Sequence, residues 1–479
     1  MSPRPNIVFI ITDDQGPWAA GCYGNDEIRT PNLDRLAASG LRFENFFCST
    51  PVCSASRASF LTGKTSSAHG VHDWIRGGNT GPDATAYLEG QVAYTDILAA
   101  NGYTCGLSGK WHLGASETPQ HGFSHWFAHE KGGGDYNDAL MVRDGKLQVI
   151  PGYITTAMTD DALGFIDANA AGPFYLGVHY TAPHSPWIGH PQDIVDSYAD
   201  CPFLSCPQEP VHPDAGPLTG RMHGRREMLQ GYFAAVTAMD ADVGRLLDHL
   251  EEKGLRDDTL VVFVSDNGFS CGHHGFWGKG NGTYPVNMYE NSVKVPFIVS
   301  HPDRIPAGQV TDVLASAYDF MPTLLEYLGL DMPDDEQLPG RSFIPALMGE
   351  ADPGKDAVII YDEYGPTRMI RTREWKYIHR YPDGPHLLYD LVNDPGERNN
   401  RVDSPDQAAR IADLQGRLEG WFTRYVHPEK DGVDRRVLGR GQLRPLGGKW
   451  EDGSDAFEQV RFVEITPAET AAGEGYDSP

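Results

Sequence analysis

The chain has 479 residues, of which 40% are hydrophobic and 22% charged, an ordinary composition for a globular protein that argues against disorder. Its formal net charge of −27 argues against binding to nucleic acid or to anionic lipid surfaces, because both need a basic face. A chain of this length is expected to fold as one large α/β core with a smaller appendage.

The N-terminus and the cysteines bear on the compartment. The first six residues lead straight into an apolar stretch without the regions of a signal peptide, and no apolar run approaches the roughly 18 residues of a membrane span. As the sequence stands we expect a cytoplasmic protein with no membrane partner, or a periplasmic or secreted one if a leader has been removed. Seven cysteines, an odd and small number, argue against a disulfide scaffold, although Cys201 and Cys206 are close enough to bridge in an oxidising compartment.

Strand and helix patterns alternate through the first 350 residues. The runs 6–12 and 259–265 are continuously apolar and β-branched, which indicates strands buried on both faces of a parallel sheet. Further strands are expected at 104–108, 174–180 and 295–300. Helices are expected at 31–39, from about Ser56, and at 93–101, 159–169, 226–253 and 318–328. The alternation predicts an α/β fold with a large mixed, mostly parallel sheet and helices on both faces.

After about residue 350, short segments with close turns replace this alternation. Strands are expected at 357–362, 367–371, 375–380 and 387–391, followed by an amphipathic helix at 406–426. We therefore predict a large α/β domain at 1–350 and a smaller α+β subdomain at 351–430, in which an antiparallel sheet packs with one helix. The remaining tail, 431–479, is weakly periodic, and we expect it to wrap around the protein or to form a homo-oligomer contact.

Two pairs of oxygen-bearing side chains follow the two most apolar strands. Asp13 and Asp14 come directly after the first strand, and Asp266 and Asn267 follow the strand at 259–265. Because ligands bind at the carboxyl ends of the strands in open α/β sheets, we expect the four side chains at one edge of the sheet. Carboxylate and amide oxygens suit Ca²⁺ or Mg²⁺ better than zinc. Each pair taken alone is equally compatible with a helix cap or a turn.

Three further loops at the same edge carry cations and imidazoles. Lys110 and His112 follow a predicted strand, and His184 lies between two prolines, which fixes the backbone around a group suited to donate a proton. Lys279 lies in the glycine-rich loop 272–280, where backbone and ammonium can approach an anion closely. A lone lysine is more often solvated and a lone histidine more often structural, so only their combination indicates a site.

A cysteine stands near the start of a predicted helix, in the run Cys-Ser-Ala-Ser-Arg at 53–57. Unpaired backbone N–H groups at a helix N-terminus favour an anion, and Arg57 can add a charge-assisted donor. Taken alone, Cys53 is more often a small buried thiol ahead of an ordinary helix.

The order of these motifs resembles the type I sulfatase family of the alkaline phosphatase superfamily. The shared features are Asp-Asp after the first strand, Cys-Ser-Ala-Ser-Arg with Leu-Thr-Gly behind it, Gly-Lys-Trp-His-Leu-Gly, Pro-His-Ser-Pro, Asp-Asn-Gly, the glycine-rich lysine loop and Leu-Tyr-Asp-Leu at 388–391. The resemblance spans about residues 5–400 and implies an alkaline-phosphatase-like fold and the hydrolysis of a sulfate ester. The family most often has proline two residues after the cysteine, where this chain has Ala55.

The resemblance also implies a modified residue and a metal. Cys53 would be oxidised after translation to formylglycine by a formylglycine-generating maturation enzyme. The modified Cys53 would complete the shell of a Ca²⁺ ion, with Mg²⁺ or Mn²⁺ as alternatives. The other ligands would be Asp13, Asp14, Asp266 and Asn267.

The remaining residues would act on the sulfate ester. Arg57 and Lys110 would hold the formylglycine and neutralise the sulfate, and Lys279 would bind sulfate oxygens. His184 would protonate the leaving alcohol. His112 matches the position that takes a proton when the sulfated intermediate collapses.

Two other functions stay open from the sequence. One is a phosphonate monoester or phosphodiester hydrolase of the same superfamily, and the other is a protein that binds a sulfated glycan without cleaving it. The acidic body is expected to repel long polysulfated chains, which favours a sulfate ester on a small sugar or aryl alcohol and an exo mode of attack. His273, His274 and Trp277 are candidates for a pocket wall or for packing.

Overall fold

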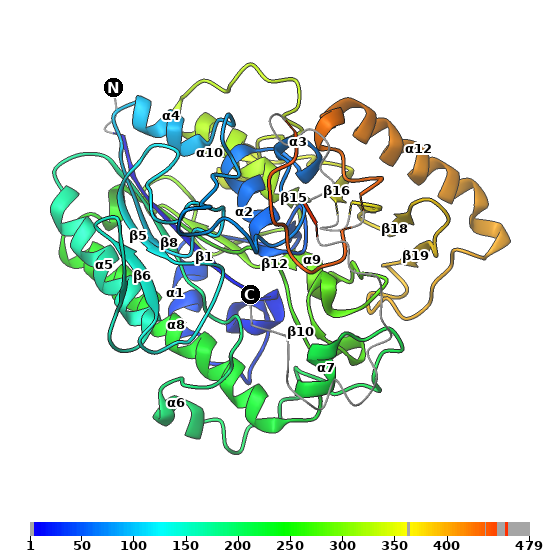
Figure 1. Cartoon of the computed structure of the whole chain (residues 1–479), viewed down its shortest axis with the longest axis horizontal. Helices are drawn as coiled ribbons and strands as arrows, with labels where there is room; N and C mark the ends of the chain where they lie inside the picture. The colour runs from blue at the N-terminus through cyan, green and yellow to red at the C-terminus, as the bar shows by residue number, and fades with distance from the viewer. Residues whose placement is uncertain (1–3, 362–364, 436, 448–455, 458–479) are drawn as a thin grey trace.

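A ten-stranded sheet forms the centre of the computed structural model, which describes residues 4–361, 365–435, 437–447 and 456–457. The strand order is β14-β2-β13-β9-β1-β8-β4-β5-β6-β7. These strands are β1 Asn6–Thr12, β2 Leu41–Phe43, β4 Thr104–Gly109, β5 Phe123–His129, β6 Leu140–Arg143, β7 Lys146–Val149, β8 Phe174–His179, β9 Thr259–Ser265, β13 Phe297–Ser300 and β14 Gln309–Thr311. Strands β9, β1, β8, β4 and β5 are parallel, whereas β13, β6 and β7 pair antiparallel. The predicted mixed, mostly parallel sheet is confirmed (Figure 1).

Strand β1 shows why the central runs are continuously apolar. Ile7, Phe9 and Ile11 contribute to one hydrophobic core, and Val8 and Ile10 to the other. Because successive side chains of a strand point to opposite faces, a strand covered on both sides needs apolar residues at every position.

Helices cover both faces of the sheet (Figure 1). The helices α1 Pro31–Ala38, α5 Ile154–Asn169 and α8 Arg226–Glu252 contribute to the core on one face. The helices α2 Cys53–Thr62, α4 Tyr94–Ala100 and α10 Phe320–Leu328 contribute to the core on the other. Helix α5 begins five residues earlier than predicted, and strands β2, β5, β6, β7 and β14 of the large sheet were not predicted.

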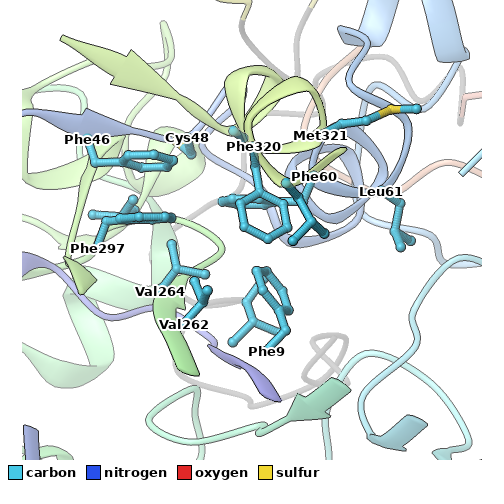
Figure 2. Packing of buried hydrophobic residues seen from close by; sticks show 14 of the residues in the cluster. Phe9, Phe46, Cys48, Phe60, Leu61, Val262, Val264, Phe297, Phe320 and Met321 are labelled. Carbon is cyan, nitrogen blue, oxygen red and sulfur yellow. The ribbon is translucent and has the colours of Figure 1, made fainter. Parts of the chain in front are cut away.

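Helix α2 is buried along its whole length and is anchored by aromatic packing. Figure 2 shows Phe60 close to Phe9 and Phe320, with ring centroids 5.9 and 6.1 Å away. The helix begins at Cys53 and not near Ser56, which corrects the sequence prediction. Ser54, the best capping residue of this segment, donates its hydroxyl to the carbonyl of His112 at 2.9 Å, so the helix starts without a side-chain cap.

The C-terminal subdomain is a four-stranded antiparallel sheet with one long helix, as predicted. Its elements are β16 Ala357–Tyr361, β17 Thr367–Thr372, β18 Trp375–Arg380, β19 Leu387–Asp390 and α12 Ala408–Tyr425. Helix α12 packs on the sheet through Leu414, Leu418 and Phe422. Position 362 and, in the predicted tail, residues 436, 448–455 and 458–479 lie outside the described residues, and the division at 350 and 430 stays a prediction.

Two further observations concern the chain as a whole. All seven cysteines are free, so Cys201 and Cys206 form no disulfide. None of the helices in the described ranges is both long and apolar enough to cross a membrane.

Candidate active site

The two acidic pairs meet at the carboxyl edge of the sheet. Thr12 of β1 pairs with Ser265 of β9, so that the residues after both strands emerge side by side. Carboxylate oxygens of Asp13, Asp14 and Asp266 lie within 4.8 Å of one another, and all three side chains are buried. Three carboxylates this close repel one another unless cations compensate them.

Asn267 completes the set of oxygen ligands. Its Nδ2 donates to Asp14 Oδ1 at 2.7 Å, whereas its Oδ1 is buried without a hydrogen-bond partner among the described residues. A buried amide oxygen without a donor is costly, and a cation would satisfy it. The donor set of three carboxylates and one amide oxygen fits Ca²⁺ or Mg²⁺.

Cys53 lies at the first position of helix α2, next to these acids. Its Sγ donates to Asp13 Oδ1 at 3.2 Å, and Lys279 Nζ donates to the same sulfur at 2.8 Å. Burial, and after it the Asp13 carboxylate, raises the pKa of the Cys53 thiol well above its ordinary value. As encoded, the side chain is therefore a protonated thiol and a poor nucleophile.

Three cationic side chains contact the acids, Arg57 from helix α2 and Lys110 and Lys279 from two loops. Arg57 Nε donates to Asp266 Oδ2 at 2.8 Å, and Lys279 Nζ donates to Asp14 Oδ1 at 2.7 Å. Lys110 Nζ donates to Asp13 Oδ2. These cations are nearly inaccessible, and each of them is paired with one of the three acids.

The cations and the acids set each other's ionisation. Burial opposes ionisation of Asp13, yet Lys110 and other nearby cationic side chains hold its pKa well below the ordinary value. Burial and the neighbouring Asp13 raise the pKa of Asp266 to about 7. Burial likewise opposes protonation of Lys279, but Asp14 and other anionic groups keep its pKa well above normal.

Two of the predicted histidines lie beside this cluster. His112 has a positive φ of 55°, its Nε2 lies 3.1 Å from the carbonyl oxygen of Ile75, and its Nδ1 is buried without a partner in the described chain. His184 Nδ1 lies 2.7 Å from the carbonyl oxygen of Ser185, and its Nε2 lies 3.8 Å from Asp14 Oδ2. Burial lowers the pKa of both imidazoles, which favours their neutral forms.

The structure therefore brings together every residue named for the site. An acidic edge able to hold a dication faces cations able to hold an anion, and two imidazoles are placed to move protons. The pocket-wall candidates do not join the cluster: His274 stacks on Tyr289 at 3.8 Å, His273 Nε2 lies 2.8 Å from the Ser205 carbonyl oxygen, and Trp277 is fully buried.

His129 is a buried histidine near the site that sequence reasoning missed. It ends β5, where Ala128 pairs with Gly109, so His129 lies opposite Lys110. Its Nδ1 lies 3.0 Å from the carbonyl oxygen of Lys131, and burial lowers its pKa to about 4. Recognising β5 as a strand of the parallel sheet would have placed its last residue at the same edge.

Comparison with known proteins gives two family matches. The model of the Sulfatase family matches residues 5–330, and a model described as N-sulphoglucosamine sulphohydrolase, C-terminal, matches residues 272–423. The chain is 31% identical to an N-acetylglucosamine-6-O-sulfatase of Bacteroides thetaiotaomicron, over 92% of this chain and 90% of the relative.

Solved structures show the same fold. A protein in complex with its substrate D-glucosamine-2-N,6-O-disulfate superposes with a TM-score of 0.77 at 27% identity, covering 90% of this chain and all of that one. A phosphonate monoester hydrolase of Agrobacterium radiobacter superposes with a TM-score of 0.68 at 21% identity, covering 88% of this chain and 96% of that one, a similarity of fold alone.

Proposed function

The chain belongs to the sulfatase family and hydrolyses sulfate esters of sugars, and from that premise we propose that it acts on a small amino sugar carrying a 6-O-sulfate, through a formylglycine made from Cys53. The observation that carries the proposed mechanism is the position of Cys53 Sγ, which contacts both an acidic metal ligand candidate and Lys279.

The state of the thiol supports the modification. Since its raised pKa keeps Cys53 protonated, the unmodified residue is a weak nucleophile at this position. Formylglycine would supply a hydrated aldehyde. One of its hydroxyls would attack sulfur and displace the alcohol, and the other would then re-form the carbonyl and expel the sulfate. Cys53 is only 2% exposed, so we expect the maturation enzyme to act before the chain folds.

The acidic edge supports a bound Ca²⁺, with Mg²⁺ or Mn²⁺ as alternatives. Asp13, Asp14, Asp266 and Asn267 would hold the ion together with the modified residue 53, and the unpartnered Oδ1 of Asn267 supports this assignment. A dication there would polarise a sulfate oxygen and lower the pKa of a bound hydroxyl.

The other side chains of the site would bind the sulfate group and transfer protons. Lys279, Lys110 and Arg57 hold the negative charge of the sulfate group, which explains how an acidic protein accepts an anionic ester. His184, oriented by its contact with the Ser185 carbonyl, donates a proton to the leaving alcohol once it is protonated itself. His112 accepts a proton at Nδ1, because its Nε2–H is directed at the Ile75 carbonyl.

The substrate class is supported by the similar proteins and by charge. The relative from B. thetaiotaomicron is named for N-acetylglucosamine 6-O-sulfate, and the structural neighbour was solved with a disulfated glucosamine. The net charge of −27 disfavours long polysulfated chains, so we propose exo attack on a mono- or disaccharide.

Peptide mass spectrometry across residue 53 tests the proposal directly. Protein purified after co-expression with a formylglycine-generating enzyme should carry an aldehyde in place of the thiol, and should release sulfate from N-acetylglucosamine 6-O-sulfate. Cys53→Ala should lower kcat/KM on the order of 10³-fold or more, whereas Cys105→Ala, at a buried thiol in β4, should leave it within about twofold. Full turnover by Cys53→Ala, or by protein whose residue 53 remains a thiol, would refute the mechanism.

A phosphonate monoester hydrolase stays the second candidate, since it shares the fold. Parallel assays of an aryl sulfate and an aryl phosphonate monoester separate the two activities. We expect kcat/KM to be higher for the sulfate. A preference for the phosphonate would reverse the assignment.

A further inference from the structure

A short segment near the C-terminus crosses the large domain beside the active site. We call residues 437–447 the C-terminal strap. Val437 and Leu446 of the strap are buried in one small hydrophobic cluster with Val286, which belongs to the loop that follows Lys279. The strap therefore packs against the segment that follows Lys279 in the chain.

The strap also pairs with the loop at 70–77. Gln442 N donates to the Trp74 carbonyl at 2.7 Å, and Arg76 N donates to the Gln442 carbonyl at 2.9 Å, which forms an isolated parallel bridge between Ile75 and Gln442. The two segments are more than 360 residues apart in the chain. This pairing holds the backbone of Ile75 in place from one side.

The side chain of Gln442 adds to this attachment. Its Nε2 donates to the Gly70 carbonyl at 2.9 Å, and its Oε1 accepts from His72 N at 2.9 Å. The residue is completely buried. Both ends of the amide are thus used to hold one loop, and an apolar replacement would leave a buried N–H and a buried carbonyl without partners.

The loop held by Gln442 is the one that orients His112. The Ile75 carbonyl lies 3.1 Å from His112 Nε2, and Ile75 N donates to the Ser54 hydroxyl at 3.0 Å. On its other side the imidazole packs closely against Gly132, where an added Cβ would lie only 2.1 Å from His112 Cε1. The position of Ile75 therefore decides which nitrogen of His112 carries the proton and where Nδ1 points.

We propose that Gln442 is a positioning residue for His112, acting through the Ile75 carbonyl, so that the C-terminal strap is part of the active-site construction. The activity readout of this proposal rests on the proposed function. The strap holds the loop, the loop accepts the Nε2–H bond, and the bond leaves Nδ1 free to accept a proton.

Steady-state kinetics of Gln442→Ala on N-acetylglucosamine 6-O-sulfate provide the first test. Because His112 moves a proton and does not hold the sulfate, we expect kcat to fall about tenfold while KM changes less than about twofold. Tyr87→Phe is a milder perturbation of the same attachment, because the Tyr87 hydroxyl donates to the Gly77 and Gln442 carbonyls at 3.0 and 3.3 Å. We expect this variant to lower kcat by about two- to threefold. The matched control is Gln415→Ala, which removes an exposed amide on α12 and should change neither constant.

Labelling with diethyl pyrocarbonate, mapped by peptide mass spectrometry, provides a readout that needs no turnover. In the wild type His112 is 1% exposed and should be protected, and in Gln442→Ala it should become reactive while His179, which is 4% exposed, stays protected. If the wild type hydrolyses none of the sulfated sugars, the proposed substrate is wrong, and the labelling still tests the role of Gln442.

Three outcomes would overturn the proposal. One is wild-type kcat with a protected His112 in Gln442→Ala. Another is simultaneous labelling of His112 and His179, which would indicate a general loosening of the fold. If Gln442→Ala does not fold, Tyr87→Phe decides the question, and an unchanged kcat in that variant counts against the proposal.

Discussion

Arg57 and Asp266 form a buried ion pair at the centre of the site, and breaking this pair should strongly lower the free energy of unfolding. The Nε–Oδ2 distance is 2.8 Å, and the two side chains are 2% and 0% exposed. Arg57→Met keeps most of the apolar stem but leaves the Asp266 carboxylate buried beside Asp13 without its nearest cation. Breaking a buried pair in this way costs about 3–5 kcal/mol, whereas an exposed pair contributes about 1 kcal/mol or less.

Urea unfolding in metal-free buffer measures this difference. The matched control is Arg373→Met, which breaks the pair with Asp312, where the side chains are 44% and 70% exposed. We expect the midpoint to shift strongly for Arg57→Met and barely for Arg373→Met, at similar m-values. Adding Ca²⁺ should narrow the gap between Arg57→Met and the wild type, because the ion compensates the charge of Asp266.

The effect should also depend on pH. Burial and Asp13 raise the pKa of folded Asp266 to about 7, so the folded state binds this proton more tightly than the unfolded chain does. The stability contributed by this proton is therefore lost as pH rises from about 4 towards 7. Removing Arg57 should raise the pKa of Asp266 further, so Arg57→Met should lose more unfolding free energy relative to the wild type at pH 8 than at pH 5. Equal midpoint shifts for Arg57→Met and Arg373→Met, at every pH and with or without Ca²⁺, would refute this reasoning.

Two further predictions concern buried charges away from the metal site. Lys376, fully buried in β18, pairs with Glu290 of the large domain and with Glu397. Lys376→Met should therefore destabilise the protein by about 3–5 kcal/mol and speed limited proteolysis of the C-terminal subdomain. A loss of stability no larger than that of the half-exposed Arg417→Met would contradict this. Burial lowers the pKa of His129 to about 4, so its neutral form contributes stability that is lost as pH falls from 6.5 towards 4. His129→Gln should therefore flatten the dependence of the unfolding free energy on pH in this range. An unchanged slope between pH 6.5 and 4 would be the contrary result.

Much of the central architecture follows from local patterns. A run such as β1, apolar at every position, can only be satisfied between two layers, and that predicts a parallel sheet covered on both faces. Once that sheet is accepted, Asp13 and Asp266 must emerge at one edge, because both follow strands that point the same way. The grouping of the acids with Lys110, which follows β4, was predictable for this reason. Lys279 follows a strand of a separate two-stranded sheet, and only its glycine-rich loop indicated a place at the site.

Other features depend on contacts that no local pattern records. Strand β5 has no clean alternation, so His129 was missed. Helix α2 begins three residues before the predicted start, and the Ser54 hydroxyl, which could have capped a later start, is bonded to the His112 carbonyl. The tail was predicted only as a wrapping segment or an oligomer contact, whereas Gln442 pairs with residues of the loop at 70–77.

The sequence by itself determined the layers of the sheet and the types of residue at its carboxyl edge, since periodicity and strand ends are local properties. Only the tertiary structure decided which groups touch: that Cys53 lies between Asp13 and Lys279, and that Gln442 holds the loop on which His112 depends. Hydrogen bonds between distant segments reflect the packing of the whole chain, and short-range periodicity does not specify them.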